Sequence, residues 1–224
     1  MQAWVTSGDG HQRLARLDPI AIEQGHAEGT VIKVDPSQGY QTIEGFGASF
    51  TDSSAWLIRN RLDARQRSAL LRDLFDPKTG LGLGLTRITI GASDFSRTHY
   101  SYDDMPPGEV DPQLAKFSIA PARADVLPVV REAMSINRTL RVFASPWSAP
   151  GWMKTSGSMI KGKLSPEYYD AFARYLQRTI AAFGAEHVPV YALSIQNEPN
   201  FQPENYPGMH MDASERAAFV GGHL

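Results

Sequence analysis

The chain has 224 residues, and 42% of them are apolar, which is enough for a substantial hydrophobic core. Its 22 Lys and Arg residues against 24 Asp and Glu residues give a formal net charge of -2 without a basic stripe, so nucleic acid is not an expected partner. The sequence contains no cysteine, which excludes disulfide scaffolds, thiolate metal sites and cysteine nucleophiles.

The first forty residues indicate short strands separated by polar, glycine-containing sequence. Residues 3–6 and 30–34 have the composition of strands. The initial segment MQAWVTSGDG lacks the basic and apolar regions of a signal peptide, and no apolar stretch approaches the roughly 20 residues of a membrane span. We therefore expect residues 1–40 to form a separate region, and we expect neither an export signal nor a transmembrane segment in this chain.

From residue 41 onward, β-rich runs alternate with longer helical patterns. Residues 41–43 lead as a strand into the glycine-rich segment GFGASF. Three further β-rich runs cover residues 83–90, 140–144 and 190–195. Each run precedes a stretch long enough for a helix, so strands and helices alternate along the chain.

The helical patterns begin and end at recognisable signals. Asp63, with Gln66 three residues later, predicts the N-cap of a helix that ends at Asp76 before a proline. Apolar residues at spacings of four predict a second helix over residues 121–136.

Two more helices are predicted in the last third of the chain. Ser165 followed by Pro166 indicates the start of one helix, and Asp212 indicates the N-cap of another. The first of these presents a single apolar face, because its large apolar residues recur at spacings of three and four. That face comprises Tyr169, Phe172, Leu176, Ile180 and Phe183.

Four strand–helix units of about 45 residues each indicate a parallel α/β architecture. A doubly wound sheet and a (β/α)8 barrel both fit this alternation of strands and helices. The two folds differ in where functional residues lie. A dinucleotide crevice would need a glycine fingerprint after the first strand, whereas the glycines of residues 80–84 precede a strand and fit a turn. In a barrel, functional residues lie where the strands end, at one mouth.

The predicted strand ends carry charged or aromatic residues beside glycine or proline. They bear Glu44 after the first strand, Arg87 and Asp94 within and after the second, Trp147 after the third and Glu198 after the fourth. Such groups suit a sugar-binding mouth better than a nucleotide crevice.

Glu198 comes where an apolar strand gives way to the tripeptide Asn197-Glu198-Pro199. Cleavage of a glycosidic bond needs a carboxylic acid that protonates the leaving oxygen, and a strand end would hold such a group at the mouth. The same tripeptide also fits an ordinary turn that ends a strand, since Asn and Pro are common in turns.

Four segments carry a resemblance to a known family. QTIEGFGASFTDSSAWLI, LTRITIGASDFSRTHYSYDD, FASPWSAPGWMKTSGSMIKGKL and YALSIQNEPN, in this order, closely resemble glycoside hydrolase family 30. That family includes lysosomal glucosylceramidase and bacterial and fungal β-glucanases. The resemblance implies a (β/α)8 TIM barrel joined to a side β-sandwich, retaining hydrolysis through two glutamates, and no cofactor.

The resemblance also implies roles for individual residues. Glu198 matches the acid/base, and Asn197 matches its neighbour that binds the sugar 2-hydroxyl. Arg87, Asp94 and Trp147 match positions that line the glucose-binding subsite. The implied substrate is a β-linked glucoside, as an oligosaccharide or a glycolipid, and the family's setting implies a secreted or periplasmic protein.

The family's nucleophile is a second glutamate after the seventh strand, and this sequence stops before it. We therefore expect residues 41–224 to be the first half of a catalytic barrel and residues 1–40 to be strands of an incomplete sandwich. Residues 1–224 alone would then hydrolyse no β-glucoside. The alternative function is a non-catalytic carbohydrate-binding protein or pseudoenzyme that keeps the pocket.

Other carboxylates and motifs have simpler interpretations. Asp94 and Glu44 are formally possible nucleophiles, but Asp94 suits hydrogen bonding to sugar hydroxyls and Glu44 a supporting role in a turn. Thr51 and Asp52 fit a helix N-terminus. Trp147 fits sugar stacking, with burial in the core as the alternative. The six histidines are scattered, and neither H-E-x-x-H nor G-x-S-x-G occurs, so we expect no metal site and no serine triad.

Overall fold

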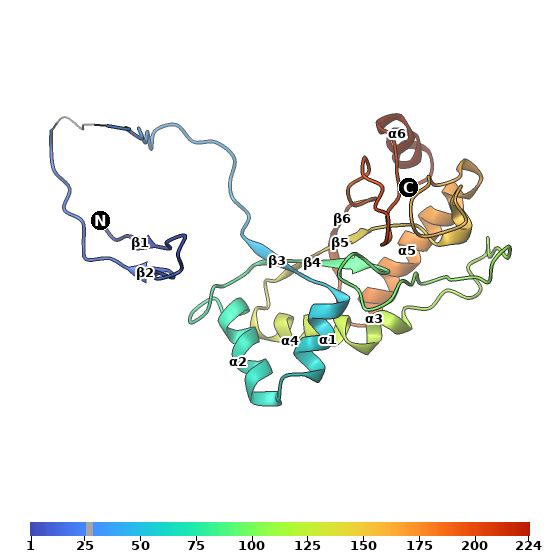
Figure 1. The fold of residues 1–224 in the computed structure, drawn as a ribbon, viewed down its shortest axis with the longest axis horizontal. Coiled ribbons are helices and arrows are strands. Elements are labelled where there is room, and N and C mark those ends of the chain that lie inside the picture. Colours follow the sequence, from blue (N-terminus) through green and yellow to red (C-terminus); the bar gives the residue numbers. More distant parts are fainter. Residues whose placement is uncertain (26–28) are drawn as a thin grey trace. The chain divides into compact units, whose positions relative to one another are not determined.

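A computed structural model describes residues 1–25 and 29–224 of the chain. The chain divides into two compact units, Met1–Thr42 and Ile43–Leu224. Each unit has its own secondary structure, and the second contains all of the predicted functional residues (Figure 1).

The first unit contains one short antiparallel pair. Strand β1 (Trp4–Val5) pairs with β2 (Ala15–Arg16), with Trp4 opposite Arg16. The prediction of a strand at residues 3–6 is confirmed in its centre, whereas the prediction at residues 30–34 is wrong, because those residues have no strand structure. Their β-branched side chains favour an extended chain, but a strand also requires a neighbour to complete its hydrogen-bond ladder.

The second unit is built on a four-stranded parallel sheet. Its strands are β3 (Gly47–Phe50), β4 (Leu85–Ile90), β5 (Arg141–Pro146) and β6 (Val190–Leu193), and their order in the sheet is the order along the chain (Figure 1). The predicted parallel α/β architecture is thus confirmed over four strands. In the described part of the chain, β3 and β6 each pair with one strand only.

Six α-helices and two 3-10 turns accompany this sheet in the described residues. Figure 1 shows α1 to α4 gathered below the strands. The elements are α1 (Asp52–Asn60), α2 (Ala64–Phe75), α3 (Ala120–Ala124), α4 (Val126–Ile136), η1 (Gly151–Met153), η2 (Pro166–Tyr168), α5 (Tyr169–Ala185) and α6 (Ala213–Gly222).

The N-cap of α2 has the predicted capping box. The Gln66 backbone N–H donates to Asp63 Oδ1 over 2.8 Å, and the Asp63 backbone N–H donates to Gln66 Oε1 over 3.0 Å. Two backbone donors that the helix cannot satisfy are thereby paired. The helix ends at Phe75, as predicted from the following Asp76 and Pro77.

The single helix predicted over residues 121–136 is instead two helices that meet at Asp125. Pro128 explains the break. A proline has no N–H to donate to the carbonyl four residues earlier, and its ring would collide with that carbonyl, which here belongs to Ala124. A new helix that starts at Val126 places Pro128 in its first turn, where a missing N–H costs little.

The first strand of the sheet lies later than predicted. It covers Gly47–Phe50 inside the glycine-rich segment, and residues 41–43 are not a strand. Gly47 allows a close approach, because a Cβ added there would lie 2.2 Å from the Leu85 carbonyl oxygen of β4. The pairing of β3 with β4 therefore requires glycine at position 47, and this glycine lies inside a strand.

This shift corrects the interpretation of Glu44. Glu44 precedes β3 and accepts a hydrogen bond of 2.8 Å from Nη1 of Arg141, the first residue of β5. Both residues therefore lie where the strands begin, and Glu44 is not at the carboxyl edge where the predicted mouth would be.

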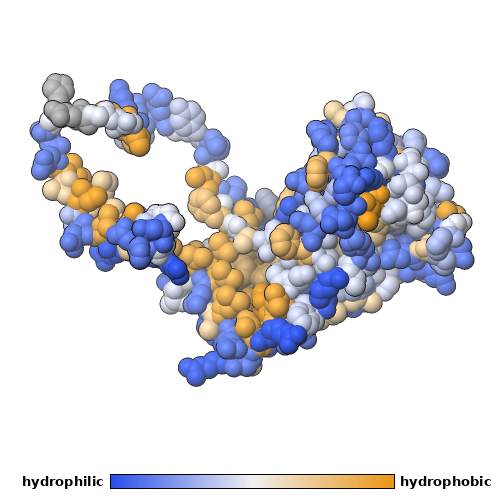
Figure 2. Space-filling view, viewed as in Figure 1, coloured by the Kyte–Doolittle hydropathy of each residue, from blue (hydrophilic) through white to orange (hydrophobic). Residues whose placement is uncertain are grey.

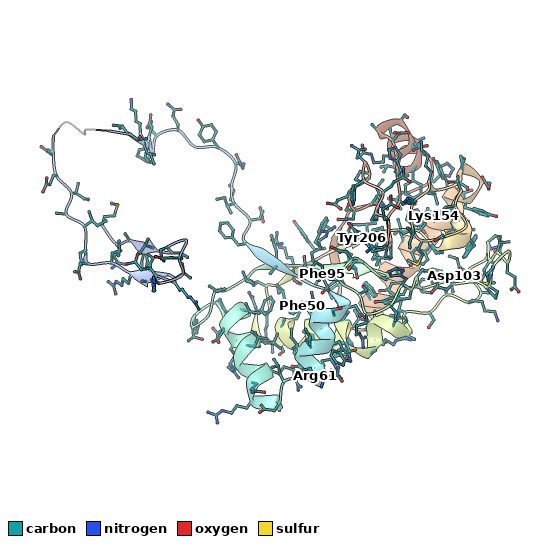
Figure 3. All side chains as sticks on the ribbon, viewed as in Figure 1. Phe50, Arg61, Phe95, Asp103, Lys154 and Tyr206 are labelled. Atoms are coloured by element: carbon teal, nitrogen blue, oxygen red, sulfur yellow. The ribbon has the colours of Figure 1, made fainter. Side chains whose placement is uncertain are left out.

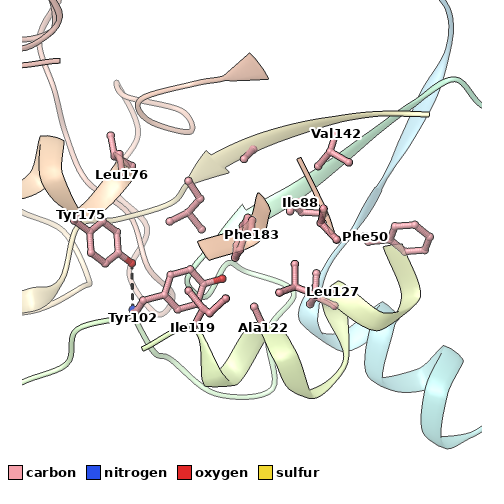
Figure 4. Close-up of a cluster of buried hydrophobic side chains, with 14 of the residues drawn as sticks. Phe50, Ile88, Tyr102, Ile119, Ala122, Leu127, Val142, Tyr175, Leu176 and Phe183 are labelled. Atoms are coloured by element: carbon pink, nitrogen blue, oxygen red, sulfur yellow. Dashed lines mark hydrogen bonds between the residues drawn. The ribbon is translucent and has the colours of Figure 1, made fainter. Parts of the chain in front are cut away.

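The main core lies between the strands and the helices (Figure 4). Ile88 and Val142 point from the sheet toward Leu127 of α4, and all three side chains are fully buried. The apolar face predicted for α5 is confirmed, with Ile180 only half-buried. Tyr175 of this helix also accepts a hydrogen bond of 3.1 Å at its hydroxyl from the backbone N–H of Tyr102 (Figure 4).

Apolar surface remains beside the outer strand β3. Figure 2 shows apolar residues gathered over the region where β3 and α2 lie. Phe46, just before β3, is 74% exposed, and Leu81, in the loop after α2, is 66% exposed. An open strand edge with apolar surface beside it is a typical place for further chain to pack.

Gly47→Ala should lower the free energy of unfolding by about 1–3 kcal/mol, because the new methyl group must displace the backbone of the neighbouring strand. Gly84→Ala is the control, since its Cβ would meet nothing within 4 Å, and the expected change is about 0.5 kcal/mol or less. Urea unfolding followed by circular dichroism measures both. Equal effects would contradict the close approach of β3 and β4.

Candidate active site

The predicted functional residues lie along the carboxyl side of the sheet. Arg87 is the third residue of β4, and Asp94 follows the end of that strand. Trp147 comes directly after β5, and Asn197 and Glu198 follow β6. Parallel strands end at the same edge of a sheet, so three segments distant in sequence meet there.

Arg87 occupies the centre of this arrangement. In β4 the residues Thr86, Ile88 and Ile90 are buried in the core, so the alternate residue Arg87 lies on the opposite face of the sheet. Its Nη2 donates to Asn197 Oδ1 over 2.6 Å, and its guanidinium carbon lies 4.5 Å from the centre of the Trp147 ring. One side chain therefore joins the ends of three strands.

The charge of Arg87 is balanced by two carboxylates. Burial lowers the pKa of Arg87, while the negative charges of Glu198 and Asp94 act in the opposite direction. Neither carboxylate comes within ion-pair distance of the guanidinium in the described part of the chain. Nε of Arg87 is buried without a hydrogen-bond partner there. The site therefore combines two exposed carboxylates with a guanidinium N–H that has no acceptor among the described residues.

The backbone at Glu198 is strained. Its φ of 43° lies in the left-handed region, which residues other than glycine rarely adopt. Asn197 fixes the chain on one side, because its backbone N–H donates to the Pro146 carbonyl over 2.8 Å. On the other side, the Glu198 carbonyl accepts from the Phe201 N–H over 2.9 Å. The turn thus presents an exposed carboxylate at a fixed position.

The side chain of Gln196 also holds this turn in place. This side chain is buried, and Nε2 donates to the carbonyls of Trp147 at 2.8 Å, Asn197 at 2.9 Å and Met209 at 3.1 Å. A single amide therefore connects the end of β5 with the segment around Glu198 and with the loop beyond it.

Two neighbouring hollows contain the predicted residues. A cavity of about 400 Å³ is lined by Arg87, Asp94 and Trp147, together with Phe95 and residues at the end of β3. A smaller hollow is lined by Trp147, Asn197 and Glu198, together with residues of the 201–208 loop. Trp147 lines both, so all five predicted residues lie around one aromatic ring.

Sequence reasoning missed two aromatic residues of this site (Figure 3). Phe95 is 66% exposed and lines the larger cavity beside Asp94. Tyr206 lines the smaller hollow. Burial raises the pKa of Tyr206, and the charges of Asp94 and Glu198 raise it further. The available signals were the position of Phe95 next to Asp94 and the Tyr-Pro-Gly sequence after the last strand.

The loop that carries Asp94 is attached to the start of α1. Thr51 caps this helix, as predicted. The next residue, Asp52, is buried and accepts hydrogen bonds from Arg97 Nε at 2.8 Å, Nη2 at 3.1 Å and the backbone N–H at 3.1 Å. The Phe95 carbonyl accepts from the Ser53 N–H over 3.1 Å. Two anchor points, at Phe95 and Arg97, thus follow directly after Asp94.

No group of three or more metal-ligating side chains is present in residues 1–25 and 29–224. Among the same residues, no helix is both long and apolar enough to cross a membrane.

Comparison with known proteins gives a family match. The model of the glycosyl hydrolase family 30 TIM-barrel domain matches residues 43–212. This range includes the four strands of the sheet and all five predicted site residues.

Several proteins of other organisms are similar in sequence to the chain. An endo-1,6-beta-D-glucanase of Neurospora crassa is 31% identical over 233 residues, which cover 100% of this chain and 48% of that protein. A protein of Caenorhabditis elegans named "Putative glucosylceramidase 1" is 34% identical over 174 residues, covering 74% of this chain and 32% of that protein. The chain spans less than half of the length of both relatives.

Solved structures show the same similarity. An endo-beta1,6-glucanase superposes with a TM-score of 0.84 at 31% identity, covering 100% of this chain and 48% of that chain. SrfJ from Salmonella typhimurium superposes with a TM-score of 0.77 at 30% identity, covering 82% of this chain and 40% of that chain.

Asp52→Asn should destabilise the protein by about 1–3 kcal/mol at pH 7, because it removes the charge from a set of hydrogen bonds. Burial acts to raise the pKa of Asp52, but the hydrogen bonds and charge of Arg97 outweigh it, so the pKa lies below its ordinary value. The stabilisation is therefore complete above the ordinary pKa of about 3.9 and is lost as the pH falls through the lowered pKa.

Unfolding in urea at pH 7 and at acidic pH measures this contribution. Asp73→Asn, on the exposed face of α2, is the matched control and should change stability by about 0.5 kcal/mol or less. A loss for Asp52→Asn that stays the same after Asp52 is protonated would contradict the role of its charge.

Proposed function

The chain belongs to glycosyl hydrolase family 30, and we propose that it is the acid/base-bearing portion of a retaining β-glycoside hydrolase. The observation that carries this proposal is the position of Glu198. Its carboxylate is exposed on a strained turn at the carboxyl edge of the sheet, beside the Arg87–Asn197 hydrogen bond.

Glu198 is proposed to act first as a general acid and then as a general base. As an acid it protonates the glycosidic oxygen while the bond to the sugar breaks, and as a base it then removes a proton from the water that releases the sugar. The exposure of the Glu198 carboxylate supports this role, since both the leaving group and water can reach it from solvent.

Four other residues are proposed to bind the sugar. The exposed carboxylate of Asp94 can accept hydrogen bonds from hydroxyl groups, and the Arg87 side chain, which carries hydrogen-bond donors, lines the same cavity. The ring of Trp147 lines the cavity and offers a stacking surface. Asn197 accepts from Arg87 at Oδ1, and its Nδ2 donates to Glu198 Oε2 over 3.5 Å, which leaves a second N–H of this amide for a sugar hydroxyl near the reacting carbon.

The nucleophile is proposed to lie outside residues 1–224. A retaining enzyme needs a second carboxylate about 5–5.5 Å from the acid/base, on the other side of the sugar. Glu44 lies where the strands begin, paired with Arg141, and Asp94 is proposed to bind hydroxyls. The single-sided pairing of β3 and β6 supports the same view, because further strands at these edges would continue the barrel.

The proposed substrates are β-linked glucosides. The relatives include endo-1,6-β-glucanases and proteins named as glucosylceramidases, so both β-glucan and glucosylceramide-like glycolipids belong to this class. We also propose that residues 1–42 contribute strands to a side β-sandwich that further chain would complete.

Glu198→Gln should impair hydrolysis according to the leaving group. In the protein expressed from its complete reading frame, kcat/KM for a poor leaving group such as methanol should fall by about 10²–10⁴-fold, because general acid catalysis supplies that much. The leaving group of a dinitrophenyl glucoside needs little protonation. The rate of glycosidic bond cleavage for this substrate should therefore fall far less. Glu204→Gln, in the same loop with a side chain that is 82% exposed, is the matched control. Equal losses for the two substrates would exclude the acid role.

Residues 1–224 on their own should hydrolyse no β-glucoside. The half-barrel supplies the acid/base and the sugar-binding residues but, in this proposal, not the nucleophile. The assay is release of 4-nitrophenol from its β-glucoside by the purified chain, with Glu198→Gln as the control for host glycosidases. Turnover that disappears in this variant would refute the assignment of the nucleophile to another segment.

A further inference from the structure

Lys154 is a buried lysine in the loop between β5 and α5. It is 4% exposed, and its Nζ donates to the carbonyls of Met159 at 2.8 Å and Gly208 at 2.7 Å. Within the described part of the chain, no carboxylate lies within 4.0 Å of its ammonium group. Buried lysines are rare unless paired with an acid, so two backbone carbonyls are an unusual set of partners.

Burial disfavours the charged form of this amine. It lowers the pKa of Lys154 to about 7, because a charge removed from water is disfavoured. A methionine would fill the same space without that cost. The presence of lysine therefore points to the hydrogen bonds that its ammonium group makes.

These hydrogen bonds connect two loops. Met159 belongs to the loop after β5, and Gly208 belongs to the loop after β6. The Gly208 N–H also donates to the Met159 carbonyl over 3.0 Å, so the two residues are joined both directly and through Lys154. Gly208 is closely packed from the other side as well, since a Cβ added there would lie 2.2 Å from Cδ of Pro203.

The anchored segment forms one wall of the hollow that contains Glu198. Gly208, Pro207 and Tyr206 all line this hollow. Lys154 and Tyr206 lie on the two loops that the amine joins (Figure 3). Because Gly208 is only two residues from Tyr206, a shift of Gly208 would move the phenol relative to the Glu198 carboxylate.

We propose that Lys154 is a positioning residue that holds residues 206–208 against Glu198 and so shapes the part of the site that receives the leaving group. This inference rests on the proposed acid/base role of Glu198, since an acid lies next to the group that it protonates. The cavity proposed to bind the sugar, which Trp147 also lines, contains none of the anchored residues. Lys154 therefore affects the leaving-group side and leaves sugar binding unchanged.

The test compares two substrates that share the sugar and differ in the leaving group. In the protein expressed from its complete reading frame, Lys154→Met should lower kcat/KM for a β-1,6-linked glucose disaccharide by about ten- to a hundredfold, the cost of a small misplacement. For methyl β-glucoside, whose leaving group is one methoxy group, kcat/KM should fall less than about threefold in the same variant. Lys154→Arg keeps donors at this position and should recover part of the loss.

Lys161→Met is the matched control, because Lys161 is in the same loop and, among the residues that the structure describes, pairs only with the exposed Glu204 carboxylate. Gly208→Ala is a second test from the opposite side, since its methyl group must push the segment away from Pro203. It should give the same selectivity change as Lys154→Met. Equal losses on both substrates in Lys154→Met and Gly208→Ala would overturn the proposal.

A structural measurement on residues 1–224 separates this inference from the proposed function. Amide hydrogen exchange of Gly208 should be at least about tenfold faster in Lys154→Met than in the parent chain or in Lys161→Met. Unchanged exchange would overturn the anchoring role, whatever the enzyme assays show. A parent enzyme without glycosidase activity would instead refute the proposed function, while faster Gly208 exchange would still support the anchor.

Discussion

A guanidinium group on a central strand sets the arrangement of the candidate site. Arg87 lies on the face of the sheet opposite the packed core, and its partial burial has an electrostatic cost. The Asn197 amide, the Trp147 ring and the charges of Asp94 and Glu198 offset that cost. These groups come from the ends of three different strands, so the parallel register that aligns the strands also brings the partners of Arg87 together.

Around this centre, the supporting contacts are mostly from side chains to backbone carbonyls and amides. Gln196 holds the turn of Glu198, Lys154 holds Gly208, and Asp52 holds the backbone at Arg97. Each of these three side chains is buried and polar, and each connects segments that are distant in the sequence. The left-handed backbone of Glu198 is tolerated because its neighbours are fixed on both sides. Rigid supporting groups of this kind are what a site needs to hold reacting atoms in place.

The sequence predicted those features that depend on local chemistry. The capping residues Asp63 and Thr51 and the apolar face of α5 were predictable, because each follows from neighbours within a few residues. The position of β3 was not predictable, because Gly47 is needed for close contact with Leu85, which lies far along the chain. Residues 30–34 show the reverse case, in which strand propensity lacks a pairing neighbour. The five site residues came from motifs, whereas the place of Tyr206 depends on how a long loop folds back.

The order of the strands bears on how such a chain can form as it leaves the ribosome. Each strand of the sheet pairs with the one synthesised just before it, so pairing can advance from β3 to β6 without waiting for distant sequence. The unpaired edge of the strand that was synthesised last is then available for pairing with the following strand. A nascent chain at this stage would expose unpaired backbone and apolar surface, and chaperones recognise such surfaces. Strand-by-strand formation of the sheet thus leaves unpaired backbone and apolar surface temporarily exposed until the next segment covers them.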